Sequence, residues 1–394
     1  MKTKFIILLA VIYIAFIALG LPDALLGSGW NMIRDDLSTS LGTLGFMTVT
    51  VYIFSILSTF NAPRLLRWFE TKRIVFFSIL FTGIALIAIS RITNFYQMLF
   101  FALPLGVGAG AIDVSLNHYL ATNYKASHMN YLHSFYGIGV TMGPSIMAYA
   151  LNLNTWRLGY VIVGSMLIGI SVLVLLSFQL WKKETQAERD TDHAHVYLKD
   201  ILKTKGAIPS ILIFLIYVHM ESLGGVWIAS YFYITKSLSY AQAALFTTTF
   251  YLALTIGRLT SGFVSHRVSP KTLIQIGITL ISISGVLMLF QYPFIWIYPV
   301  LVFLFGLGCA PIFPNMMFLN SKNFDQKKLS KIMSLQMGVG YMGFGILTPL
   351  AGMMFDLTTI SIYPFVMIVM GLLLVFLTLK YFHQTDIKQI TDLI

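Results

Sequence analysis

The sequence predicts an all-α membrane protein in which twelve transmembrane helices form two similar six-helix halves. Only 10% of the 394 residues are charged and 57% are hydrophobic, whereas a soluble domain carries about 25% charged residues. Apolar runs recur along the whole chain, and each is long enough to cross a hydrocarbon core about 30 Å thick. One hydrophilic stretch near the middle separates six of these runs from the other six.

The apolar runs define the expected spans and the domain organisation. We expect the twelve spans at residues 5–33, 41–62, 73–90, 94–121, 129–151, 158–181, 208–234, 240–266, 272–291, 294–320, 332–355 and 361–382. They give an N-terminal half of residues 1–181, a cytoplasmic linker of residues 182–207 and a C-terminal half of residues 208–394. The first run could pass for a signal peptide, but no small-residue cleavage site follows it, so we predict a span.

Positive charge is distributed so unevenly along the chain that it indicates a topology. The formal net charge of +11 could suggest a nucleic-acid-binding protein. With the N-terminus placed in the cytoplasm, however, 21 of the 26 basic residues fall in cytoplasmic segments and only four in outer loops. This distribution follows the positive-inside rule. We therefore expect a multi-pass protein of the cell membrane with both termini in the cytoplasm, and no nucleic-acid partner.

Matching residues recur in the two halves at a shift near 200 positions. The stretch LGVGAGAIDVSLN (105–117) aligns with FGLGCAPIFPNMM (305–317), and glycines match at two positions. Asp23 in the first span aligns with Glu221 in the seventh at a shift of 198. Two parallel six-helix repeats related by an axis along the membrane normal are known among secondary transporters. The repeat therefore favours that class of membrane protein.

Four sequence stretches resemble one transporter family. They are GLPDALLGSGW (20–30), GVGAGAIDVSLN (106–117), MNYLHSFYGIGVTMGP (129–144) and GRLTSGFVSHRVSP (257–270). The chain resembles the fucose–proton symporter branch of the major facilitator superfamily over nearly its whole length. The resemblance implies the major facilitator fold, import of a sugar with protons, and acidic residues in the first and fourth helices as functional groups.

The chain also departs from the superfamily pattern. The usual loop between the second and third helices has an Asp after a Gly, but here residues 61–73 read NAPRLLRWFETKR. The counterpart in the second half, GFVSHRVSPK (262–271), lacks the acid as well. The departure weakens any inference about how the cytoplasmic gate closes and leaves the fold assignment unaffected.

Three carboxylates lie inside expected spans, namely Asp23, Asp113 and Glu221. An ionised carboxylate at the bilayer centre costs about 2.5–3.5 kcal/mol even on the lowest scale, so such residues face a protein interior or a water-filled cavity. We predict that these three acids carry the coupling protons, Asp23 and Asp113 being the positions that the family resemblance implies. The alternatives are a buried acid satisfied by a neighbouring helix for Asp113, contact with outer-leaflet water for Asp23, and an ion pair with Arg258 for Glu221.

Polar and aromatic residues on the same helix faces as the acids are candidates for solute contact. Asn117 lies one turn after Asp113, and Tyr217 lies one turn before Glu221. An amide or hydroxyl beside a carboxylate suits a hydroxylated ligand. The complete set of predicted solute contacts is Trp30, Asn117, His133, Tyr136, Tyr217, Asn315 and Gln336. His133, Asn315 and Gln336 could equally be satisfied core residues.

Three further residues are predicted to have structural or gating roles. Arg258 lies towards the cytoplasmic end of the eighth span, where pairing or capping near an inner gate is expected. Gly27 shares the face of Asp23. Gly110, three residues before Asp113, would let a neighbouring helix approach closely.

These features together predict a secondary transporter that moves a small polar solute, a sugar, by alternating access coupled to protons. The two halves are expected to rock around a central cavity, with sodium left open as the coupling ion. An efflux antiporter for an amphipathic compound is the alternative, because 14% aromatic residues suit that kind of pocket too. A receptor or scaffold is disfavoured, because it would not need acids in three separate spans.

Other classes of function lack their sequence signatures. No Gly-Lys-Ser/Thr phosphate-binding loop, HExxH or GxSxG motif is present, which argues against an ATP-driven pump or an enzyme of these types. His193 and His195 are too sparse for a metal site, and we expect no cofactor and no metal. We expect the protein to act as a monomer in the lipid bilayer.

The predicted topology can be tested by cysteine labelling. A cysteine at Thr93, in an expected outer loop, should react with an impermeant maleimide in intact cells, whereas a cysteine at Thr191 in the central linker should not. The reverse labelling pattern would overturn the assignment of both termini to the cytoplasm.

Overall fold

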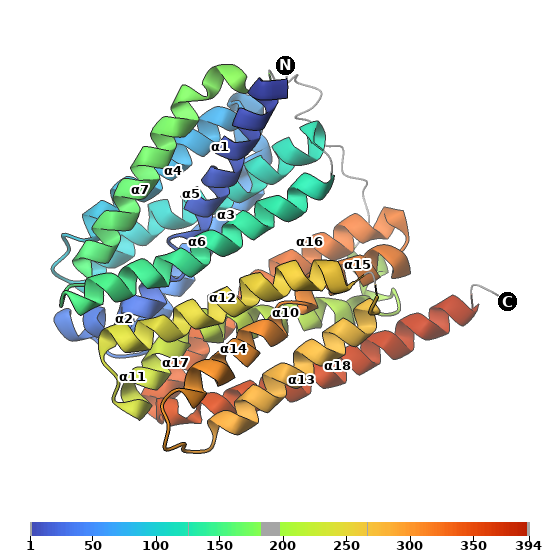
Figure 1. Ribbon diagram of the computed structural model, residues 1–394. Helices are drawn as coiled ribbons and strands as arrows, with labels where there is room; N and C mark the ends of the chain where they lie inside the picture. The colour runs from blue at the N-terminus through green and yellow to red at the C-terminus, as the bar shows by residue number, and fades with distance from the viewer. Residues whose placement is uncertain (1, 125, 183–197, 266, 392–394) are drawn as a thin grey trace. The chain divides into compact units, whose positions relative to one another are not determined.

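The computed structural model describes residues 2–124, 126–182, 198–265 and 267–391. Within these residues the chain forms helices and no strands (Figure 1). The first helices are α1 (Lys2–Gly20), α2 (Leu25–Asp36), α3 (Thr43–Trp68), α4 (Thr71–Ile89), α5 (Phe95–Asn123), α6 (Ala126–Asn152) and α7 (Arg157–Leu176), followed by a short 3-10 helix (Phe178–Leu180).

The chain continues with α9 (Leu198–Leu202), α10 (Ala207–Ser222), α11 (Ile228–Lys236), α12 (Tyr240–Val264), α13 (Pro270–Met288), α14 (Ile297–Cys309), α15 (Ile312–Asn323), α16 (Gln326–Met342), α17 (Thr348–Leu357) and α18 (Tyr363–Thr391). Ten helical stretches within the described residues are long and apolar enough to cross a membrane. The other two expected spans coincide with α6 and α12, helices of 27 and 25 residues. The predicted all-α membrane fold is confirmed.

Two of the expected spans, the first and the tenth, each consist of two helices. The first span is interrupted at residues 21–24, between α1 and α2, and the tenth at residues 310–311, between α14 and α15. Pro22 and Pro311 lie in these interruptions. A proline has no N–H to donate and its ring clashes with the preceding turn, so the helix ends there.

Two other spans contain a wide helical turn. Residues 223–227, between α10 and α11, and residues 343–347, between α16 and α17, form π-helical turns. The first contains the adjacent glycines Gly224 and Gly225. Single π-helical turns are frequent at functional sites.

The chain forms two compact units. One comprises residues 1–192 together with 228–248, and the other comprises residues 193–227 together with 249–394. Thus α11 and the beginning of α12 belong with the N-terminal unit. The predicted linker over residues 182–207 includes residues 183–197, which lie outside the described part of the chain. The predicted domain boundaries therefore stay a prediction.

Glycines that match between the two halves make equivalent helix contacts. A Cβ at Gly106 would overlap the backbone oxygen of Val51 on α3, and a Cβ at Gly306 would overlap that of Phe250 on α12. Each of these partners lies two spans before the glycine. Small residues let transmembrane helices approach this closely. The internal repeat seen in the sequence is therefore also a repeat of backbone contacts within each unit.

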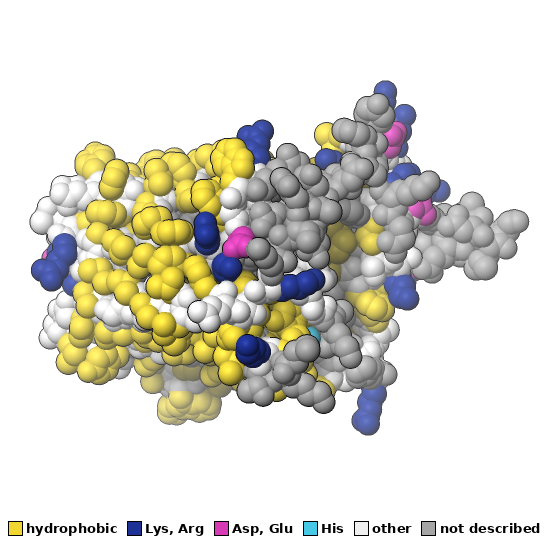
Figure 2. Space-filling model, turned by 90° about the horizontal axis from the view of Figure 1, so that it is seen from above, with side chains coloured by type: hydrophobic (Ala, Val, Ile, Leu, Met, Phe, Trp, Pro, Cys, Tyr) yellow, Lys and Arg dark blue, Asp and Glu magenta, His cyan; other side chains and the backbone are white. Residues whose placement is uncertain are grey.

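Large apolar side chains are exposed over much of the described surface, as Figure 2 shows for one face. Phe60, Phe100 and Phe263 expose 75%, 70% and 79% of their surface. Exposed apolar area on this scale marks a surface that contacts another apolar phase. Lipid tails supply that phase for a membrane protein.

Candidate functional site

Asp23 lies in the interruption between α1 and α2, and its side chain is exposed. The backbone turns tightly there, with the N–H of Asp23 donating to the carbonyl of Gly20 over 3.2 Å and the N–H of Leu25 donating to Pro22 over 3.1 Å. Asp23, expected inside the first span, therefore lies at a break between two helices of that span. Broken helices with unwound backbone form the binding sites of several transporter folds.

Three glycines bring α1 and α6 into backbone contact beside this break. A Cβ at Gly139 would overlap the backbone oxygen of Ile17, and a Cβ at Gly20 would lie 2.5 Å from the backbone oxygen of Tyr136. Gly143, one turn further along α6, faces the backbone oxygen of Leu21 in the same way. The close approach fixes the part of α6 that carries Tyr136 against the end of α1.

The hydroxyl of Tyr136 donates a 2.6 Å hydrogen bond to Oδ2 of Asp23, across 113 residues of sequence. A hydrogen bond to an ionised acceptor is about twice as strong as one between neutral groups. The sequence singled out both residues but did not pair them, because helix phase within one span says nothing about contacts between spans. This pair is the centre of the candidate site.

His133 precedes Tyr136 by one turn of α6, and aromatic side chains of α1 pack against this part of α6. His133, on α6, is exposed and meets the ring of Phe16 edge-on at 5.7 Å between centroids. Tyr13 stacks on Phe135 at 4.7 Å. Sequence reasoning missed Phe16 as part of this neighbourhood. Phe16 is 1% exposed, so it packs against His133 from within the protein.

Asp113 and Asn117, which the sequence placed on one face of a helix, are hydrogen-bonded to each other on α5. Nδ2 of Asn117 donates to Oδ1 of Asp113 and to the backbone oxygen of Asp113, each over 2.8 Å. Both side chains are half-buried. An amide nitrogen has two hydrogens, so these two bonds use both of them. The amide oxygen of Asn117 remains available as an acceptor for a solute hydroxyl.

Gly110 has the close-contact position that was predicted for it. A Cβ at Gly110 would overlap the backbone oxygen of Ser55 on α3 and lie 2.9 Å from the hydroxyl of Thr59. This contact presses α5 against α3 one turn before Asp113. Gly27 is buried on α2, and its predicted gating role stays a prediction.

Glu221 is joined to Arg258 and Tyr217 within the C-terminal unit. Nη2 of Arg258 lies 3.0 Å and 3.2 Å from the two carboxylate oxygens of Glu221 and 3.1 Å from the hydroxyl of Tyr217. Tyr217 in turn donates a hydrogen bond to Glu221. The side chains of Arg258 and Glu221 are only 24% and 12% exposed. This geometry favours the ion-pair alternative for Glu221, while its role in proton coupling stays a prediction.

Two predicted solute contacts, Trp30 and Asn315, are buried between helices. Trp30 is fully buried, and its indole nitrogen donates to the backbone oxygen of Leu41 over 2.9 Å. Asn315 is 6% exposed and donates over 2.7 Å to the backbone oxygen of Pro311, one turn earlier on the same helix. The structure therefore gives these two side chains an evident structural role.

Gln336 belongs to a fully buried polar network at one end of the C-terminal unit. Its amide nitrogen donates to the hydroxyl of Ser210 over 2.6 Å, and Ser210 donates to Asn320 over 2.8 Å. Tyr381 donates to the same amide oxygen of Asn320 over 2.9 Å. The network joins α10, α15, α16 and α18, so Gln336 orders these helices. Solute contact at Gln336 stays a prediction without a geometric counterpart.

No group of three His, Cys, Asp or Glu side chains that could hold a metal ion occurs among the residues that the structure describes. His193 and His195 lie outside them.

Comparison with known proteins identifies relatives of the whole chain. A family model described as Major Facilitator Superfamily matches residues 12–236 and residues 210–391. The glucose/mannose transporter GlcP of Bacillus subtilis is 23% identical over 379 residues, which cover 93% of this chain and 91% of the relative. Bypass of stop codon protein 6 of Saccharomyces cerevisiae is 24% identical over 309 residues, which cover 69% of this chain and 61% of that protein, less than two thirds of its length.

Solved structures with the same fold are transporters. The crystal structure of the nucleoside transporter NupG matches 98% of this chain and 99% of its own with a TM-score of 0.69 at 15% identity. A bacterial homolog of the human lysosomal transporter Spinster, in an inward-facing and occupied conformation, matches 98% of this chain and 97% of its own with a TM-score of 0.71 at 14% identity. At this level of identity the likeness shows the fold.

The ion pair of Glu221 and Arg258 predicts a specific pattern of stability. Glu221→Gln should lower the melting temperature of the purified protein strongly, because leaving one charge of a buried pair costs about 3–5 kcal/mol. Adding Arg258→Gln should restore most of the loss. As the control, Asp386→Asn breaks the half-exposed pair with Lys271 and should cost at most about 1 kcal/mol. A Glu221→Gln variant as stable as the Asp386→Asn variant would contradict a structural ion pair.

Proposed function

This chain belongs to the Major Facilitator Superfamily, and we propose that it moves a small polar solute, a sugar, across the membrane by proton-coupled alternating access. Members of this family with the same fold are transporters and not enzymes. Membership of the family gives the class of protein, a transporter. The solute, the coupling ion and the direction of transport are the proposal.

The hydrogen-bonded pair of Asp23 and Tyr136 is the observation that carries the proposal. It combines an exposed carboxylate, a hydroxyl donor and a helix break in one place. While Asp23 is ionised, it holds the hydroxyl of Tyr136 through a charge-assisted bond. When Asp23 takes up a proton, that bond weakens and the hydroxyl can turn to a solute. Proton binding and solute binding are thereby linked through one side chain.

A sugar is the solute class that fits these groups best. Its hydroxyls can donate to the oxygens of Asp23 and Asn117 and accept from Tyr136 and His133, while its apolar face can lie on a half-buried aromatic ring such as Phe135. The similarity to a glucose/mannose transporter over 93% of this chain supports a hexose in particular.

Asp113 is the second proposed proton carrier. Its carboxylate is half-buried in the middle of α5 and receives one hydrogen bond, from Asn117. Burial in a low-dielectric environment disfavours a charge that lacks a cationic partner. No basic side chain among the described residues forms an ion pair with Asp113, in contrast to Glu221. Asp113 is therefore better suited than Glu221 to gain and lose a proton during the transport cycle.

Transport assays in proteoliposomes test the roles of these acids. Asp113→Asn should abolish proton-driven accumulation of a hexose and leave counterflow exchange at least partly intact, because exchange needs no net proton release. Asp23→Asn should behave similarly or impair solute binding. Asp200→Asn, which removes an exposed acid from α9, is the control and should accumulate like the wild type.

If the Asp113→Asn variant accumulates the hexose to the wild-type level, Asp113 does not carry the coupling proton. Loss of counterflow in both acid variants, with normal melting temperatures, would instead point to a binding role for the acids.

A further inference from the structure

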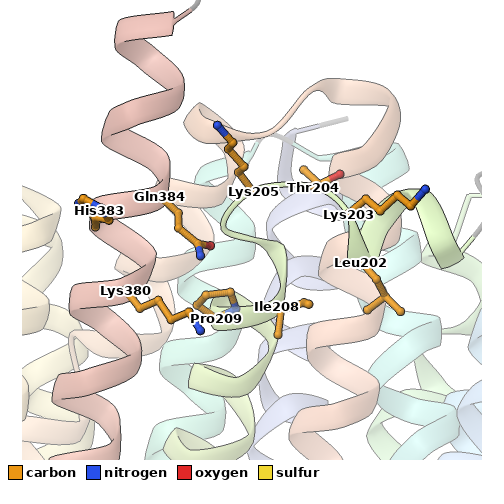
Figure 3. A pocket seen from close by; sticks show the side chains of 9 residues that line it. All are labelled: Leu202, Lys203, Thr204, Lys205, Ile208, Pro209, Lys380, His383 and Gln384. Carbon is orange, nitrogen blue, oxygen red and sulfur yellow. The ribbon is translucent and has the colours of Figure 1, made fainter.

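A pocket of about 440 Å³ lies in the C-terminal unit, beside the start of α10 and the last turns of α18 (Figure 3). Lys203 and Lys205 come from the segment that joins α9 to α10, and Lys380 and His383 come from α18. Figure 3 shows Lys205 and Lys380 on opposite sides of Gln384. The proposed solute site uses none of these residues.

Contacts between the backbone of Gly206 and side chains of α18 hold the two walls of this pocket together. Gly206 has a left-handed backbone with φ of +84°, which favours glycine. Its N–H donates to the side-chain oxygen of Gln384 over 2.9 Å. A Cβ at Gly206 would also lie 2.9 Å from the methyl group of Thr385. The segment that carries Lys205 is therefore fixed against α18. As a result, Lys205 from this segment and Lys380 from α18 line the same pocket.

The charge of the pocket is positive, with no acid among the described residues that line it. Asp386, two residues after Gln384, pairs with Lys271 at 2.5 Å. A further lysine approaches from α16, because Nζ of Lys328 lies 3.4 Å from the hydroxyl of Thr204, which lines the pocket. Several ammonium groups around one cavity create a site for an anion.

Exposed apolar side chains border the same cavity. Leu202 and Ile208 line it and are 47% and 45% exposed. Their position beside the lysines gives the pocket a charged part and an apolar part. A free inorganic anion would use only the first part, whereas a phospholipid would place its phosphate on the lysines and its acyl chains against the apolar side chains.

We propose that this pocket binds the phosphate group of an anionic phospholipid from the cytoplasmic leaflet. Basic pockets between transmembrane helices on the cytoplasmic side are known to bind such head groups. Lysine binds phosphate as a compact point charge on a flexible stem. A bound lipid would bridge α18 and the segment before α10, and so stabilise this end of the C-terminal unit. The choice of leaflet rests on the predicted topology, which the maleimide experiment tests separately.

Binding can be measured with the full-length protein in phosphatidylcholine nanodiscs that contain increasing fractions of phosphatidylglycerol. The melting temperature of the wild type should rise with phosphatidylglycerol. In the double variant Lys205→Gln, Lys380→Gln the midpoint of this rise should move to about 30-fold more lipid, because each lysine near the surface contributes about a fivefold factor. The matched control is Lys199→Gln with Lys322→Gln, which removes two exposed lysines outside the pocket and should respond like the wild type.

Two results of the lipid titration would overturn the proposal. An unchanged midpoint in the Lys205, Lys380 double variant would overturn it, and so would an equal shift in the control, because the effect would then belong to surface charge in general. A separate arm adds inorganic phosphate to pure phosphatidylcholine nanodiscs, and the proposal expects no rise in melting temperature. A rise that depends on the two lysines would overturn the lipid as the source of the phosphate. Lys205→Arg with Lys380→Arg should keep the lipid response, which shows that a loss in the glutamine variant does not come from misfolding.

Discussion

The backbone contact between α1 and α6 is the constraint on which the candidate site depends. Gly139 and Gly143 have no Cβ, so α6 can lie against the backbone oxygens of Ile17 and Leu21. Only at this distance can the hydroxyl of Tyr136 reach Asp23. The break that Pro22 introduces leaves the carboxylate outside a regular helix. The chemistry proposed for the site therefore depends on three glycines, Gly20, Gly139 and Gly143, and on Pro22, none of which carries a functional group.

The fold could be predicted from the sequence because its causes are local and repeated. Apolar runs, the distribution of lysine and arginine, and the matching glycines each depend on residues near one another or on a simple period. The interruption at Pro22 could have been predicted from the same rules, since proline cannot donate within a helix. It was missed because the apolar character continues on both sides of the proline, and a run of hydropathy does not report backbone geometry.

The site was predictable only as a set of residues, because hydrogen bonds between spans depend on how helices face each other. Within one helix the spacing of Asp113 and Asn117 was sufficient to place them on one face, where the structure joins them by a hydrogen bond. Between helices it was not, as Tyr136 and Gln336 illustrate. Both are polar residues in apolar spans, yet one meets an exposed acid and the other a buried network. Burying a polar group without a hydrogen-bond partner is costly, so both side chains must have a partner. The sequence does not show which residue that partner is.

Solute and protons are proposed to enter together, and the pH change on addition of solute measures this coupling most directly. In proteoliposomes without an imposed gradient, a hexose added outside should make the external medium more alkaline as protons enter with it. The Asp113→Asn variant should give no such change. Acidification of the external medium would indicate an antiporter, and a wild-type protein that transports hexose with no pH change would contradict proton coupling.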